Sequence, residues 1–222
     1  MIPLTFTEEE IRRILEALDF YSRIWIGQYD HILWEMRWMK DCDKLDLFDE
    51  AIRKKFIKMR QIILPALEDY PLSASFGIFS DKRDVKVAIA YDMQQEFRYK
   101  KAWFLHPEGG YTVDFGSPLP CEDDPCVFPK AECYRENGEF RIRVTIEEVQ
   151  LSIMIDALQV RALADQGQMR KVFSYYTDDS CALSLADDIT DIFMGIDTVY
   201  AWDRALTDHL LEKLKRWKTE VS

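Results

Sequence analysis

Glycine is scarce in this sequence. Only eight glycines occur among 222 residues, and no two of them follow a G-x-G or G-x-x-x-x-G spacing. Those spacings let a backbone approach the phosphates of a nucleotide in Rossmann folds and in P-loops. Both of these nucleotide-binding folds are therefore excluded.

Long apolar runs are also missing. No run approaches the roughly 20 residues that span a bilayer, and the first residues lack the basic and then apolar pattern of a secretion signal. The five cysteines are odd in number, which favours free thiols in a reducing compartment over a disulfide framework. We therefore expect a cytoplasmic protein with no membrane association.

The charge balance excludes a further class. Forty acidic residues against 29 basic ones give a net charge of -11, which opposes non-specific attraction to nucleic acid or anionic lipid. Hydrophobic residues make up 48% and charged residues 31%, as in soluble globular proteins. The length predicts one large domain or two small ones.

One segment of the sequence recurs at an offset of 140 residues. Residues 4–18 align without a gap with residues 144–158, and Gly27-Gln28 falls opposite Gly167-Gln168. In both copies a short alternating pattern, typical of a strand, leads into apolar residues at helical spacing. A Thr-x-x-Glu capping box is expected in each copy, and a weaker match joins residues 90–92 to 201–203. The predicted boxes are Thr5 with Glu8 and Thr145 with Glu148.

These patterns predict an internally duplicated, mainly helical α+β protein. A unit of one strand and several helices would occur twice about a pseudo-two-fold axis, with a small antiparallel sheet. We expect a first unit at 1–116, a connecting loop rich in proline, cysteine and acids at 117–138, and a second unit at 139–222, packed as one globular body. Ligand sites favour the seam between such units. The expected strands are 2–6, 111–115 and 139–146, and the expected helices are 7–39, 45–68, 83–104, 147–172, 179–194 and 197–218.

Part of the chain resembles small hypothetical proteins of bacteria, prophages and phages. The similar residues lie between 4 and 118 and include the segment 18–28. The resemblance implies a phage-like or mobile-element setting and no particular activity, and the second copy lacks the aromatic residues of the pattern. The pattern comprises Phe76-Gly-Ile-Phe-Ser80, Ala90-Tyr-Asp-Met-Gln-Gln-Glu-Phe-Arg-Tyr99, Ala102-Trp103, Pro107-Glu-Gly-Gly-Tyr-Thr-Val-Asp-Phe115 and Pro118.

One predicted helix combines basic and aromatic residues. Positions 91, 95 and 98 share a helical face, with position 101 close by. Such a face can stack a base on a ring and hold a phosphate with arginine. The alternative is a core-facing aromatic stripe edged by long basic side chains. The candidate ligand-binding residues are Tyr91, Gln95, Arg98, Lys101, Trp103 and Gln28.

Two groups of residues are candidate metal ligands. Cys121, Cys126 and Cys133 with His106 could supply a zinc site, although the loose spacing, without a C-x2-C pair, favours free thiols. Asp187, Asp188 and Asp191 lie at helical spacing and could hold Mg²⁺ beside a diphosphate. The alternative for these carboxylates is the solvated face of an amphipathic helix.

No catalytic motif appears in the sequence. There are three histidines, and neither a G-x-S-x-G nor an H-E-x-x-H pattern occurs. We expect a non-enzymatic binding protein that sequesters a small nucleotide-like ligand or blocks a host protein. The alternatives are an acidic protein-protein inhibitor and a Mg²⁺-dependent phosphohydrolase, and self-association is left open.

Overall fold

The computed structural model describes residues 1–37, 45–109, 117–121, 126–193 and 201–221. Within these ranges it confirms the predicted mainly helical α+β class with a small antiparallel sheet. None of the described helices is both long enough and apolar enough to cross a membrane. The elements in chain order are β1 (Ile2–Thr7), α1 (Glu8–Trp25), α2 (Tyr29–Arg37), α3 (Leu45–Ile63), the 3-10 helix η2 (Pro65–Leu67), α4 (Val85–Leu105), β2 (Lys130–Glu136), β3 (Glu139–Ile146), α5 (Glu148–Asp165), α6 (Met169–Phe173), α7 (Ser180–Phe193) and α8 (Ala201–Val221).

The three strands form one antiparallel sheet in the order β1-β3-β2. In the central pairing Leu4 lies opposite Val144, and Ile2 lies opposite Ile146. Apolar side chains alternate with polar ones along β1 and β3, so one face of the sheet is buried. That face includes Phe6, which is fully buried, and it forms one end of the core.

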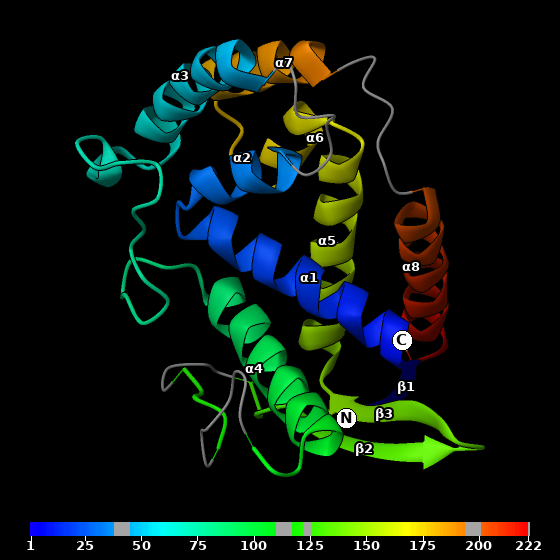
Figure 1. The fold of residues 1–222 in the computed structure, drawn as a ribbon. Helices are drawn as coiled ribbons and strands as arrows, with labels where there is room; N and C mark the ends of the chain where they lie inside the picture. The colour runs from blue at the N-terminus through cyan, green and yellow to red at the C-terminus, as the bar shows by residue number, and fades with distance from the viewer. Residues whose placement is uncertain (38–44, 110–116, 122–125, 194–200, 222) are drawn as a thin grey trace.

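The helices pack around two central ones, α1 and α5. Helix α1 crosses α5 at the centre, α3 lies beside α7, and α4 and α8 lie on opposite flanks (Figure 1). Helix α4 packs mainly on α1 and also contacts α5, whereas α8 packs mainly on α5 and also contacts α1. The core is therefore continuous from the sheet through the crossing of α1 and α5.

Both strand-to-helix junctions carry a capping box, two residues later than predicted. The Thr7 hydroxyl accepts a hydrogen bond from the Glu10 N–H at 3.2 Å, and Glu10 accepts one from the Thr7 N–H at 2.8 Å. At the second junction the Glu147 N–H donates to Gln150 at 2.7 Å. The prediction of Thr5 and Thr145 as caps is wrong because both residues still pair within the sheet.

Glycines break the two long helices that the sequence predicted at 7–39 and 147–172. Gly27 has φ +93° and Gly167 has φ +68°, a left-handed conformation that ends helices readily only at glycine. The Gln28 N–H then donates to the Arg23 carbonyl at 2.9 Å, and the N–H of residue 168 donates to the carbonyl of residue 163, also at 2.9 Å. Each long helix therefore becomes two.

Strand β2 was missed by the sequence analysis, which predicted a connecting loop at 117–138. A turn with Asn137 and Gly138 both at positive φ joins β2 to β3 as a hairpin. Strand β2 is largely exposed and carries charged residues, so it lacks the apolar alternation that signals a strand. The predicted strand 111–115 lies outside the described residues.

Side chains protect both edges of the sheet. At the β1 edge Lys213 of α8 donates to the Thr5 carbonyl at 3.2 Å, and Pro3 has no N–H to offer to another strand. At the β2 edge the buried Glu96 of α4 accepts a hydrogen bond from the Ala131 N–H at 3.1 Å. Burial raises the pKa of Glu96, while this backbone hydrogen bond opposes the rise.

The strand pair at the centre of the sheet yields the first prediction. Leu4→Ala should lower the free energy of unfolding by about 2–5 kcal/mol, because it leaves a cavity in a packed interior. Val149→Ala on α5 is the matched control, since Val149 is 44% exposed, and it should change stability by about 0.5 kcal/mol or less. Urea unfolding measures both, and equal effects of the two variants would contradict this description of the core.

Candidate functional site

Three of the predicted binding residues lie together on α4. Arg98 donates from Nη2 to Gln95 Oε1 at 3.2 Å, and Gln95 donates to Gln94 Oε1 at 3.0 Å. Gln95 is buried, whereas Arg98 and Tyr91 are half-buried. Within the described part of the chain, Arg98 has no carboxylate partner.

Helix α1 continues this chain of hydrogen bonds. Gln94 donates to Asp19 Oδ1 at 3.3 Å, and Arg23 donates from Nε to Asp19 Oδ2 at 2.7 Å. Arg23 also donates from Nη1 to Gln28 Oε1 at 2.9 Å. The predicted residues Gln28, Gln95 and Arg98 are thereby connected. We call the whole set the polar network: Asp19, Arg23, Gln28, Gln94, Gln95 and Arg98.

The segment 64–84, which we call the anchored loop, adds an aromatic side chain beside the network. Gln28 donates to Ser75 Oγ at 3.5 Å, and the Phe76 N–H donates to the Ile26 carbonyl at 3.1 Å. Further along, the ring of Phe79 meets that of Tyr91 edge-on, with centroids 6.0 Å apart. Phe79 is nevertheless 63% exposed, so an aromatic surface remains open next to the network.

Tyr91 connects the exposed ring to the cation. Burial raises the pKa of Tyr91, and the neighbouring Arg98 charge acts in the opposite direction. The phenol is therefore protonated at neutral pH and keeps its hydrogen-bond donor. Tyr91 therefore contacts the ring of Phe79 and lies within electrostatic range of the Arg98 guanidinium.

Arg60 of α3 holds the anchored loop in place. Its buried guanidinium donates to the carbonyls of Pro71 at 2.7 Å and Leu67 at 3.2 Å, and also to the carbonyl of Tyr70. Burial lowers the pKa of Arg60, because the surrounding carbonyls replace water only in part. The loop conformation thus depends on one side chain.

Gly27 allows the anchored loop to approach the end of α1 closely. A Cβ at this position would lie 2.6 Å from a Leu67 methyl and 2.9 Å from a Leu64 methyl. With φ at +93°, other residues would also be strained there. The glycine that ends α1 therefore also brings the loop next to Gln28.

The other two predicted binding residues lie elsewhere on α4. Lys101 forms an ion pair with Glu8 at 3.4 Å, at the first turn of α1. Trp103 is half-buried, and its ring centroid lies 6.3 Å from that of Tyr99. Neither residue has a recorded contact with the polar network, so the described contacts divide the six candidates into two groups.

The candidate zinc ligands are spread over several elements. Cys121 is buried, and its N–H donates to Asp92 at 2.8 Å, whereas Cys133 lies on β2 and His106 follows α4 as an exposed residue. Burial raises the pKa of Cys121 and that of Cys133 to about 11, which disfavours the thiolates that zinc requires. Among the residues described, no three side chains suited to a metal ion gather together.

The three candidate magnesium ligands on α7 connect helices instead of converging. Asp187 forms an ion pair with Arg170 of α6, and Asp188 forms one with Lys55 of α3 at 2.5 Å. Asp191 is exposed on the same helix. Two of the three carboxylates therefore already have basic partners.

No protein-family model, curated protein or solved structure matches the chain. The resemblance to phage and prophage proteins therefore stays a prediction.

Sequence reasoning missed several residues around the site. Asp19 and Arg23 stand four residues apart on a predicted helix, and this spacing could have indicated an ion pair. Ser75 and Phe79 lie beside the network because the anchored loop folds back toward the end of α1. Ser75 is 47 residues from Gln28, and no local pattern predicts that contact.

The role of Arg60 can be tested by substitution. Arg60→Met should lower the free energy of unfolding by about 2–4 kcal/mol, because several carbonyls lose their donor, and should speed amide hydrogen exchange in residues 64–84. Arg53→Met is the control, since Arg53 is partly exposed and forms one surface ion pair with Asp30. This variant should lower the free energy of unfolding by about 1 kcal/mol or less. Unchanged exchange in the loop would show that Arg60 does not hold it.

Alkylation tests the description of the cysteines. Iodoacetamide at pH 8 should modify the exposed Cys181 first and Cys121 and Cys133 slowly, because a thiol with a pKa of about 11 is almost wholly protonated there. Their rates should rise about tenfold per pH unit below that pKa. Mass spectrometry follows each site, and Cys133 reacting as fast as Cys181 in the folded protein would contradict the assignment.

Proposed function

We propose that this protein binds a small nucleotide-like ligand without transforming it, and thereby sequesters it. The binding surface consists of the polar network, Tyr91 and the exposed Phe79 of the anchored loop. The ligand we propose carries an anionic group and an aromatic ring, as a mononucleotide or a cyclic or dinucleotide signal does. We also propose a phage-like setting for this function.

The observation that carries this proposal is the half-buried Arg98, which has no carboxylate partner among the residues that the structure describes. Arg23 of the same network, in contrast, is neutralised by Asp19 at 2.7 Å. Among the described residues, Arg98 forms a hydrogen bond with the neutral Gln95, and we propose that its guanidinium also forms charge-assisted hydrogen bonds to a phosphate. The overall charge of -11 makes such a local cation more selective for a small anion than for a long polyanion.

The aromatic side chains support the same ligand class. Phe79 exposes most of its ring and is positioned by its edge-on contact with Tyr91. Exposed rings next to a cation stack nucleobases, and this stacking is worth about 1–3 kcal/mol per base. In this proposal the base of the ligand stacks on Phe79 and its phosphate binds Arg98.

The described side chains favour binding over turnover. In the polar network, Asp19 is paired with Arg23. The other members are the three neutral amides of Gln28, Gln94 and Gln95 and the cation of Arg98, and none of these four is a base that could activate a water molecule. On α7, Asp187 and Asp188 are each paired with a basic residue. A hydrolase using these carboxylates would first have to break those pairs.

We further propose that the fold arose by duplication, and that only the first copy carries the binding site. Helices α1 and α5 have equal lengths at the 140-residue offset, both end before a left-handed glycine, and the β1–β3 register is symmetric about Leu4 and Val144. Helices α4 and α8 are both 21 residues long, although Ala90 is the sixth residue of α4 and Ala201 the first of α8. The second copy has Gln159 and Leu163 where the first has Asp19 and Arg23, so the network is not repeated.

Thermal unfolding with a panel of mononucleotides, cyclic nucleotides and dinucleotides, each with Mg²⁺ or with EDTA, tests the proposed function. A ligand at 100 times its Kd should add about 2.7 kcal/mol, which raises Tm by roughly 5–10 °C. Arg98→Ala should weaken binding about tenfold to a hundredfold, because it removes a charged hydrogen bond. Arg216→Ala, an exposed arginine near the end of α8, should bind as the unaltered protein does.

The outcomes separate the candidate functions. A Mg²⁺-independent shift that Arg98→Ala abolishes supports sequestration at this site. A shift that requires Mg²⁺ would favour the phosphohydrolase and the α7 carboxylates, and equal binding by Arg98→Ala would remove the proposed site. No shift with any compound would favour a protein partner, and pull-down at low and high salt would then test the acidic inhibitor.

A further inference from the structure

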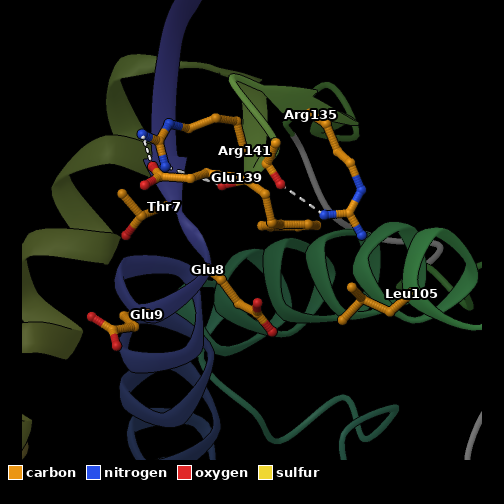
Figure 2. A pocket seen from close by; sticks show the side chains of 9 residues that line it. Thr7, Glu8, Glu9, Leu105, Arg135, Glu139 and Arg141 are labelled. Carbon is orange, nitrogen blue, oxygen red and sulfur yellow. Dashed lines mark hydrogen bonds and ion pairs between the residues drawn. The ribbon is translucent and has the colours of Figure 1, made fainter.

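A cavity of about 490 Å³ lies away from the polar network, between the β2–β3 hairpin, the first turn of α1 and the end of α4. This volume falls within the range of roughly 300–1,000 Å³ that is typical of small-molecule sites. Leu105 and Phe140 supply its apolar surface, and its charged residues come from two sides. In Figure 2, Arg135 extends from the hairpin and Glu8 from α1, with Leu105 of α4 beside them.

The hairpin side offers one positioned cation. The Arg135 guanidinium donates from Nη1 to the Gly138 carbonyl at 3.0 Å and lies 5.9 Å from the centre of the Phe104 ring. These contacts hold the guanidinium in one orientation, and no carboxylate of the described chain pairs with it. Arg141, in contrast, is neutralised by Glu139 at 2.7 Å and Glu136 at 3.3 Å. Arg135 is therefore the cation that a ligand can use.

The α1 side carries surplus negative charge. Glu8 and Glu9 both line the cavity and are exposed. One cation faces them, since Lys101 pairs with Glu8 at 3.4 Å, and Glu9 has no partner within the described residues. Among the described residues, the cavity thus presents Arg135 without an ion-pair partner on one side and Glu9 without a partner on the other.

From this division of charge we propose that the cavity binds a small zwitterion with a primary ammonium and a carboxylate, namely a free amino acid or a short peptide. The carboxylate lies against Arg135, whose planar donors match a carboxylate. The ammonium lies toward Glu8 and Glu9, and an apolar side chain lies against Leu105 and Phe140. A simple anion is disfavoured by the two glutamates, and a simple cation by Arg135.

Isothermal titration with the dipeptide Leu-Leu and with free leucine tests this site in the full chain. N-acetyl-Leu-Leu, which lacks the ammonium, and Leu-Leu amide, which lacks the carboxylate, should each bind about tenfold or more weakly than Leu-Leu. Arg135→Ala and Glu8→Gln should weaken Leu-Leu binding by a similar factor. Comparison of Leu-Leu with leucine distinguishes a peptide site from an amino-acid site.

Two control variants carry comparable charge changes outside the cavity. Arg216→Ala and Glu50→Gln each remove one charge from an exposed helical ion pair, and both should bind Leu-Leu normally. Circular dichroism checks that every variant is folded. The inference is overturned if neither Leu-Leu nor leucine binds at millimolar concentration, if the blocked dipeptides bind equally well, or if Arg135→Ala binds as the unaltered protein does. It is independent of the nucleotide-like ligand proposed above.

Discussion

The pairing of β1 with β3 is the constraint on which the rest of the structure depends. It places Leu4 against Val144 and so joins the beginning of the chain to a segment about 140 residues away. Helices α1 and α5 follow directly from these two strands and cross at the centre of the molecule, with the sheet at one end (Figure 1). Their crossing leaves two flanks, which α4 and α8 cover. The position of α4 against α1, and hence the polar network, follows from this strand pair.

Local backbone features then decide what surrounds the network. Gly27 ends α1 in a left-handed conformation and leaves room for Leu67 beside it. The buried Arg60 then holds the following loop through backbone carbonyls, without a carboxylate. Burying such a cation is costly unless its donors are satisfied, so the loop carbonyls and Arg60 stabilise each other. This mutual dependence brings Ser75 and Phe79 next to α1 and α4.

The sequence predicted the fold class because the apolar periodicities are strong. Helix α4 was predicted within two residues at each end, and β3 was predicted with its observed bounds, since its apolar residues alternate regularly. The capping box of α1 was predicted two residues too early, because Thr5 and Thr7 each precede a glutamate by three residues. Only the strand pairing of Thr5 distinguishes the two threonines. Strand β2 escaped prediction because its stability comes from pairing with β3 and from Glu96, not from its own pattern.

The candidate site was predictable only in part, for a similar reason. Positions on one helix, such as Gln95 and Arg98, follow from helical spacing, but their neighbours come from other segments. The link from Gln94 to Asp19 joins residues 75 apart, and the contact of Phe79 with Tyr91 depends on the anchored loop. Lys101 and Trp103 belong to the same basic and aromatic run of the sequence as Arg98. In the structure, however, Trp103 contacts Tyr99 and Lys101 pairs with Glu8.

The most direct measurement of the central claim is the nuclear magnetic resonance signal of the Arg98 side chain during titration with the mononucleotide that stabilises the protein most. The Nε–Hε correlation is assigned by its loss in Arg98→Lys. The binding account predicts that this signal and the side-chain amide signals of Gln95 and Gln28 move together and saturate with ligand. Movement confined to signals outside the polar network, or no movement with any compound of the panel, would contradict it.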